Sequence, residues 1–221
     1  MTYAGDKTIY DSDSHLMELP DYLSRHADAK TRALLPDLGE ALTGTFDANA
    51  YAGLDRHPLE VADKLAAMGD NLIKGPKWHA ALGAFNGDER GRALDLLGFK
   101  RQVVFSSFCA RLIFASESDD LAYGAAAAQN RSIADFCDVD DRLMGVAMVP
   151  LQDVPRAIQE IDHAIELGLA AIWISADAPG GRSPGHIEHD AIWAKLAEAG
   201  LPFILHVGSA PLAIEDEWLN D

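Results

Sequence analysis

The sequence predicts an α/β fold built on parallel strands. Short runs rich in β-branched and aromatic residues alternate with segments of helical periodicity, and this order repeats along the chain. Most of the runs have nearly continuous apolar middles, which is typical of strands buried on both faces of a parallel sheet. We expect strands at 8–15, 101–108, 142–150, 170–178 and 202–208.

Capping residues mark the helices expected between the later strands. Asp153 can cap a helix that has Pro155 in its first turn, and Gly168 ends it. Two further helices are expected at 119–137 and 190–199. The expected apolar stripe of the helix after Asp153 comprises Val154, Ile158, Ile161 and Ile165.

The interval after the first strand is too long for one crossover connection. It contains expected helices at 58–72 and 88–97, with Gly- and Pro-rich segments between them. We interpret 16–100 as a helical insertion that folds over the carboxyl ends of the strands as a lid. Residues 1–221 would then form a single domain that contains this insertion.

Composition and charge limit the possible partners. The 221 residues include 35 acidic and 18 basic residues, a formal net charge of −17, and no Lys/Arg-rich run. Nucleic acid and anionic membranes are therefore disfavoured as partners. Cys109 and Cys137 cannot form a disulfide framework, and no segment has the roughly 20 apolar residues of a membrane span. Together with the absence of a signal-like N-terminus, this pattern favours the cytoplasm.

The stretch "YDSDSHLME" carries the most distinctive polar pattern. Asp11, Asp13 and His15 alternate, so in a strand their side chains would project from one face near its carboxyl end. His206 closes the fifth expected strand in the same way. Because ligands collect at the carboxyl ends of parallel strands, these residues could bind a divalent cation such as zinc, manganese or iron. The alternative is structural: the run could hydrogen-bond a neighbouring turn, and either histidine could be a core residue.

Three longer blocks carry a family resemblance. "YDSDSHLMELPDYL", "DRLMGVAMVPLQDVPRAIQEIDHAIELGL" and "HDAIWAKLAEAGLPFILHVG" together resemble the amidohydrolase-2 family, which includes aminocarboxymuconate-semialdehyde decarboxylase and related aromatic-acid decarboxylases. The resemblance covers most of the chain between Thr8 and Gly208, apart from the insertion. It implies a TIM-barrel-like (β/α)8 fold with one divalent metal, zinc or manganese.

The resemblance also implies a set of metal ligands. Asp13 and His15 match the H-x-H or E-x-H pair of the family's first strand, and His206 matches the histidine of its fifth strand. Aspartate at the first ligand position departs from the usual His or Glu. Asp11 is expected to support the site or to hydrogen-bond inside the barrel.

This chain supplies fewer strands than a whole barrel has. A (β/α)8 barrel has eight strands in about 250 residues, whereas five strand-like runs are found here. The later Asp and His of the family have no counterpart in the sequence. The chain could be a fragment of a longer protein, a barrel completed by a partner chain, or an abbreviated inactive relative. The fragment is favoured, and exposed edges at the first and fifth strands would favour a homo-oligomer.

Three further residues are candidates for substrate binding. Arg111 follows the second expected strand and Arg182 follows the fourth, where either could grip a substrate carboxylate. Each could instead be a solvated loop arginine. Trp173 could face the ligand or pack in the core, whereas His186 and His189 are interpreted as structural.

The function that we expect is that of a metal-dependent hydrolase or carboxy-lyase. It would decarboxylate or hydrolyse a small aromatic or unsaturated carboxylic acid, with Asp13, His15 and His206 holding the metal. The alternative is a truncated, non-catalytic barrel that binds a ligand or a partner chain. A doubly wound domain with a flavodoxin-like ligand site would also explain the alternation of strands and helices, but not these three residues.

Overall fold

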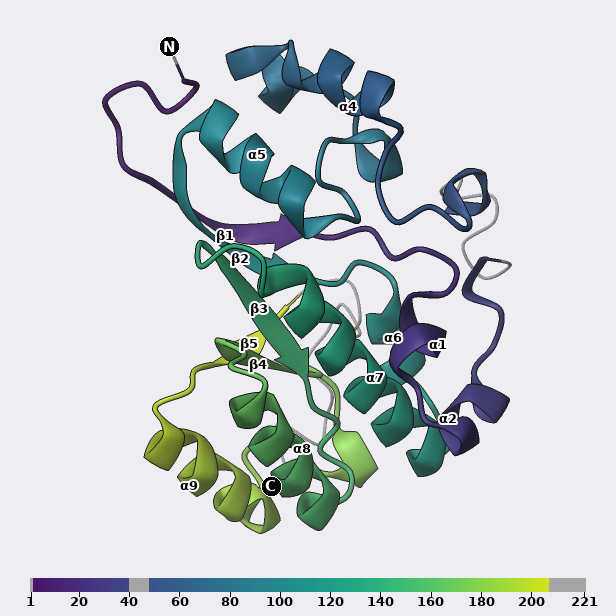
Figure 1. Ribbon diagram of the computed structural model, residues 1–221. Coiled ribbons are helices and arrows are strands. Elements are labelled where there is room, and N and C mark those ends of the chain that lie inside the picture. The colour runs from purple at the N-terminus through teal and green to yellow at the C-terminus, as the bar shows by residue number, and fades with distance from the viewer. Residues whose placement is uncertain (1, 40–47, 207–221) are drawn as a thin grey trace. The chain divides into compact units, whose positions relative to one another are not determined.

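The described part of the chain contains five parallel strands, as the sequence predicts. The computed structural model describes residues 2–39 and 48–206, and Figure 1 shows its strands and helices. The strands pair in the order β1-β2-β3-β4-β5, so consecutive strands are neighbours and each pair is parallel. Their bounds are Ile9–His15 for β1, Phe99–Phe105 for β2, Leu143–Met148 for β3, Ala171–Ile174 for β4 and Phe203–Leu205 for β5.

The chain forms two compact units. The first comprises Met1–Tyr22, Pro36–Phe108 and Ile133–Gly145, and the second comprises Leu23–Leu35, Cys109–Ser132 and Val146–Asp221. The first unit contains β1, β2 and the beginning of β3. The second unit contains the rest of β3 together with β4 and β5.

In the first unit, helices of the insertion pack beside β1 and β2. α5, Gly87–Leu97, lies along this pair of strands (Figure 1). Asn86 caps α5 by accepting a hydrogen bond from the Glu89 amide, and Gly98 ends it in the left-handed conformation. The predicted helix at 58–72 is divided, because α4 ends at Ala66 and a short 3-10 helix follows. The other helical segments are α4, Leu59–Ala66, and the 3-10 helices Ala48–Tyr51, Gly69–Lys74 and Trp78–Ala80.

In the second unit, α8 and α9 pack against each other and follow β3 and β4. Asp153 caps α8 as predicted, but the fully buried positions of α8 are Ala157, Ile161 and Ala164. Ile165 belongs to the predicted apolar stripe but is 38% exposed, because the buried face of α8 is centred on Ala157, Ile161 and Ala164. The helices are α2, Ala29–Leu34, α6, Cys109–Phe114, α8, Val154–Glu166, and α9, Asp190–Ala199, with 3-10 turns at Pro179–Gly181 and Ile187–His189.

Two helices continue from one unit into the other. α1 spans Tyr22–His26, and α7 spans Asp119–Cys137, as the sequence predicts for the Ala-rich segment. Both cysteines are buried and neither forms a disulfide, in agreement with a structural role. Among the described residues, none of the helices combines the length and apolar character needed to cross a bilayer.

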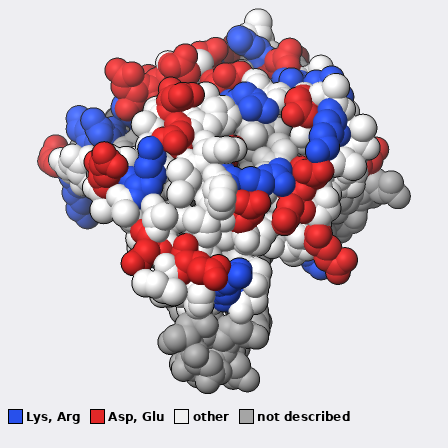
Figure 2. Space-filling view, turned by 90° about the horizontal axis from the view of Figure 1, so that it is seen from below, with Lys and Arg blue, Asp and Glu red and all other residues white. Residues whose placement is uncertain are grey.

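Charged side chains of both signs are interspersed on the surface. On the face shown in Figure 2, Lys and Arg lie among Asp and Glu, and over the described part of that face they form no continuous basic patch. Several exposed arginines and lysines are held in ion pairs, such as Arg92 with Asp63 and Lys30 with Asp120.

Candidate metal centre

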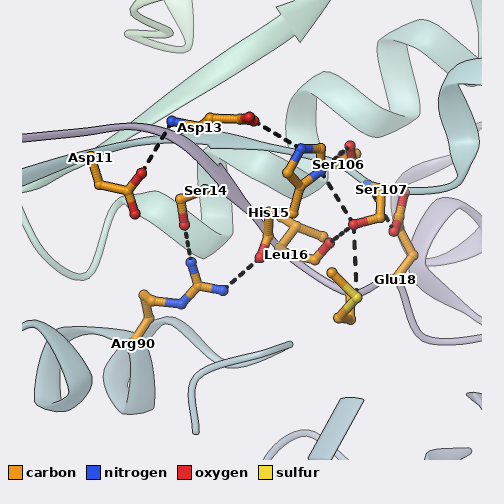
Figure 3. Close-up of polar contacts among 10 residues, drawn as sticks. Asp11, Asp13, Ser14, His15, Leu16, Glu18, Arg90, Ser106 and Ser107 are labelled. Carbon is orange, nitrogen blue, oxygen red and sulfur yellow. Dashed lines mark hydrogen bonds and ion pairs between the residues drawn. The ribbon is translucent and has the colours of Figure 1, made fainter. Parts of the chain in front are cut away.

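Asp13 and His15 lie together at the carboxyl end of β1, within the first unit. Asp13 Oδ1 is 3.2 Å from His15 Nε2, and Figure 3 shows the two side chains directed toward one another. The side chain of Asp13 is 67% exposed and that of His15 is 28% exposed, so solvent reaches the pair. A carboxylate oxygen and an imidazole nitrogen are both ligands that divalent metals accept.

The second ring nitrogen of His15 is oriented by the segment after β2. His15 Nδ1 is 3.2 Å from the carbonyl oxygen of Ser106, which can only accept, so Nδ1 carries the proton. The Ser107 hydroxyl donates to the carbonyl of Leu16 and can accept from the same Nδ1. With Nδ1 protonated, a neutral ring presents an acceptor lone pair on Nε2. This tautomer is the one that a metal-binding histidine needs.

The facing acceptors at Asp13 and His15 fit a cation. A carboxylate oxygen and an unprotonated Nε2 repel at 3.2 Å unless a proton or a cation binds both. A divalent ion can be bound by these two atoms while the Ser106 carbonyl holds the back of the ring. The residues present therefore fit the metal that the sequence pattern suggests.

Asp11 does not share the arrangement expected from strict alternation. The register of β1 against β2 shifts between Asp11 and Ser14. Asp11 pairs with Gln102 and Ser14 with Val104, so a step of three residues in β1 matches a step of two in β2. This irregularity inserts one additional residue and changes the side to which the later side chains point. Asp11 accepts a hydrogen bond from Gln102 Nε2 and from the Asp13 amide. Asp11 is thus hydrogen-bonded to the neighbouring strand, whereas Asp13 makes the contact with His15 Nε2.

Two buried charged residues beside β1 were missed by the sequence interpretation. Glu18 is fully buried, and its carboxylate accepts hydrogen bonds from the amides of Ser107 and Phe108 at 3.1 and 2.7 Å. It thereby anchors the segment whose Ser106 carbonyl orients His15. In the sequence, the nearness of Glu18 to His15 is the signal that could have indicated its role. An acidic residue at this position is, however, also typical of the start of a helix.

Arg90 is the second of these residues. It extends from α5 toward β1, where it donates to the carbonyl of His15 at 2.8 Å and to Ser14 Oγ at 2.6 Å (Figure 3). Its other acceptors are the Gly83 carbonyl and Gln102 Oε1. Arg90 therefore fixes the main chain of β1 at the residue that bears the candidate ligand.

His206 directly follows β5 in the second unit. Its ring lies 4.8 Å, centroid to centroid, from the indole of Trp173. Trp173 belongs to β4, is 2% exposed, and also contacts the ring of Phe114. Trp173 is therefore a core residue whose ring also packs against His206, the histidine that the sequence predicts as a metal ligand.

The two candidate arginines lie in different local settings. Arg111 is exposed on α6, which begins four residues after β2 ends. Arg182 forms an ion pair with Glu188, with 3.0 Å between Nε and Oε2. His186 accepts from the Glu188 amide, and buried His189 donates from Nδ1 to the Ser183 carbonyl, so both have the structural contacts expected for them.

The fold and the polar residues at the carboxyl end of β1 define a class of protein. Parallel strands paired in chain order, each followed by helical structure, and metal-ligand types at a strand's carboxyl end are the features of a (β/α)8-barrel protein with a polar centre. The chain also matches the family model described as Amidohydrolase (Amidohydro_2) over residues 11–217. It belongs to this family, and the resemblance noted in the sequence is confirmed.

Solved structures share the fold. An amidohydrolase from Mycobacterium avium subsp. paratuberculosis matches with a TM-score of 0.65 at 20% identity, over 92% of this chain and 59% of that one. The 5-carboxyvanillate decarboxylase of Novosphingobium aromaticivorans, complexed with manganese and 4-hydroxy-3-methoxy-5-nitrobenzoic acid, matches with a TM-score of 0.55 at 17% identity, over 92% and 51%. The fold is therefore that of a TIM-barrel-like amidohydrolase, of which the described residues provide five strands.

A curated relative is also similar in sequence. Decarboxylase orsB of Emericella nidulans is 28% identical over 123 residues, which is 54% of this chain and 35% of that protein. This chain thus spans about a third of the length of the curated relative and between half and three fifths of the solved chains.

Proposed function

We propose that this protein is a metal-dependent amidohydrolase-family enzyme that acts on a small aromatic or unsaturated carboxylic acid. The reaction would be decarboxylation or hydrolysis of a C–C or C–N bond. Family membership supports the enzyme class, and two of the similar proteins are named as decarboxylases. The observation that carries the proposal is the Asp13–His15 pair, with Nδ1 of His15 held by the Ser106 carbonyl.

The metal, zinc or manganese, would be held by Asp13, His15 and His206. His15 is the last residue of β1 and His206 directly follows β5, and the carboxyl ends of the strands of a parallel sheet lie at the same edge. A bound divalent ion supplies Lewis acidity, which polarises a carboxylate or lowers the pKa of a water. Ser106 and Glu18 would keep the imidazole of His15 in the orientation that this role requires.

The substrate would be held by side chains that follow other strands. Arg111, exposed on α6, can form a bidentate contact with a carboxylate. Arg182 would first have to exchange its Glu188 partner for the substrate. Trp173, next to His206, offers an apolar wall suited to an aromatic or unsaturated acid.

The test is metal content measured together with the intact mass of the same sample. The wild type is expected to bind about one zinc or manganese per chain, and His15→Ala, Asp13→Asn and His206→Ala are expected to lose it. Asp11→Asn is the matched control on the same strand, because Asp11 bonds Gln102 and should leave metal uptake unchanged. His186→Ala controls for the loss of a histidine elsewhere.

Two results would decide against the proposal. Full metal retention in His15→Ala and His206→Ala would remove these residues from the ligand set. A wild type that takes up no zinc or manganese and releases no carbon dioxide from aromatic acids would support the alternative, a non-catalytic barrel that binds a ligand or a partner.

A further inference from the structure

A cavity of about 250 Å³ lies in the first unit, next to β1 and α5. Its wall is mostly apolar, and β1 contributes Ser14 and His15 to one side of it. Arg90 and Gln102 also line it and supply polar groups. The apolar side chains are those of Met17, Leu72, Ile73, Leu82 and Leu97.

Arg90 brings a buried positive charge to this cavity. The residue is 8% exposed, and every hydrogen bond that it donates goes to a neutral acceptor: two carbonyls, one hydroxyl and one side-chain amide. A guanidinium has five N–H groups, so one of those on Nη2 has no acceptor among the described residues. A buried cation without an anion in contact is unfavourable.

The neighbouring groups compensate this charge only in part. The Asp11 carboxylate reaches Arg90 only through Gln102, which donates to Asp11 and accepts from Arg90. The ring of Phe136 lies 5.5 Å from the guanidinium carbon and gives a cation–π contact. Burial raises the pKa of the Cys137 thiol to about 12, so this neighbour is neutral at physiological pH. Among the described residues, no carboxylate forms an ion pair with Arg90.

We propose that the cavity binds a small amphiphilic monocarboxylate. The ligand carboxylate would meet the remaining N–H of Arg90, and its hydrocarbon part would lie against Leu72, Ile73 and Leu82. A single buried cation beside an apolar wall suits one negative charge on an apolar body, whereas a phosphate would need more donors than this site offers.

The size and lining of the cavity agree with such a ligand. An apolar protein cavity of about 150 Å³ binds benzene, so 250 Å³ admits a short fatty acid. Lys77 and Trp78 also line the cavity, and both are exposed. The exposed Lys77 adds a positive charge that attracts an anion from solution. Trp78 adopts φ of 56°, a conformation that a tryptophan rarely adopts and that often marks a ligand-binding segment.

The test is calorimetric titration of the full chain with hexanoate after metal removal with EDTA. We expect saturable binding, with hexanol about ten-fold weaker or more, because hexanol lacks the charge that Arg90 recognises. Ile73→Trp narrows the cavity at a half-buried position and should weaken hexanoate binding to the same degree. Leu59→Trp, at a 72% exposed position of α4 outside the cavity wall, is the matched control.

Arg90→Met should abolish hexanoate binding. If Arg90→Met does not fold, Ile73→Trp still tests the site. Equal affinity for hexanoate and hexanol would overturn the proposal, as would undiminished binding by Ile73→Trp or the absence of saturable binding. Hexanoate binding that survives Asp13→Asn, a change at a proposed metal ligand outside the cavity wall, separates this site from the metal centre, and metal uptake by the same variants reports on the proposed function independently.

Discussion

A buried His57–Glu89 pair in the insertion makes the stability of the first unit depend on pH. His57 is 2% exposed and Glu89 is 8% exposed, and His57 Nδ1 lies 2.7 Å from Glu89 Oε2. His57 Nε2 lies 2.9 Å from the His79 carbonyl. Because both ring nitrogens face acceptors, the ring satisfies both only as an imidazolium. The rings of Tyr51 and Phe85 cover it and exclude water.

The pKa values of the two groups move in opposite directions. Burial alone would lower the pKa of His57, but the hydrogen bond and charge of Glu89 raise it above its ordinary value of 6.5. Burial alone would raise the pKa of Glu89, but His57 lowers it below 4.5. The contribution of His57 is therefore complete below pH 6.5 and is lost as pH rises through its folded pKa. The contribution of Glu89 is complete above pH 4.5 and is lost as pH falls through its folded pKa.

Removing either His57 or Glu89 should lower the free energy of unfolding substantially. Breaking a buried ion pair on one side costs about 3–5 kcal/mol, and Glu89→Ala also leaves the amides of His57 and Gly83 without their acceptor. For a domain of this size, 1 kcal/mol corresponds to about 2–4 °C in melting temperature. Glu89→Ala should therefore melt roughly 6–20 °C below the wild type at pH 5.5.

The assay is urea unfolding of the wild type and of a His57→Gln, Glu89→Gln double variant at several pH values. As pH rises above 6.5, the unfolding free energy of the wild type should fall more steeply than that of the double variant. Parallel pH profiles for the two proteins would refute the assignment of an imidazolium at His57, and a Glu89→Ala variant as stable as the wild type would refute the magnitude.

Three further outcomes can be checked on single variants. Glu18→Gln should lower the unfolding free energy in urea by about 1–3 kcal/mol, because a buried acceptor of two amides is replaced by an amide that also donates. Ile161→Ala should cost about 2–5 kcal/mol, whereas Ile165→Ala, 38% exposed, should cost far less; equal losses would contradict the buried face of α8. Cys137 should resist iodoacetamide at pH 8 in the native protein and react once it is unfolded, since burial raises its pKa to about 12.

The positions of the strands and most helix ends could be predicted from the sequence, because they depend on local patterns. The apolar runs of β3 and β4 and the Asp153 cap are signals that tertiary contacts did not overrule. The contact face of α8 was predicted only in part, because the buried face is rotated from the isoleucine stripe toward Ala157 and Ala164, which leaves Ile165 exposed. The side that is buried depends on which neighbour packs against it, and here alanines form the closest contact.

The polar contacts around β1 could be predicted only where the two residues in contact lie close together in the sequence. Asp13 and His15 are two residues apart, and their contact follows from that spacing. Arg90 lies in "GDERGRALDLL", which has the composition of a solvated helix face, and nothing local shows that its side chain reaches β1. Its burial results from a contact across 75 residues, and such contacts are not encoded in a short window.

The register shift in β1 gives Asp11 and Asp13 different roles although they look equivalent in the sequence. In a regular strand both carboxylates would project from the face that bears His15, about 7 Å apart, and two like charges so placed repel each other. With the extra residue, Asp11 is directed to Gln102, near the cation of Arg90, and only Asp13 reaches His15 Nε2. Each carboxylate thus lies nearest a different positive partner, Arg90 for Asp11 and the proposed metal for Asp13. This separation explains how a strand with two aspartates and a histidine can offer a metal one carboxylate and one imidazole.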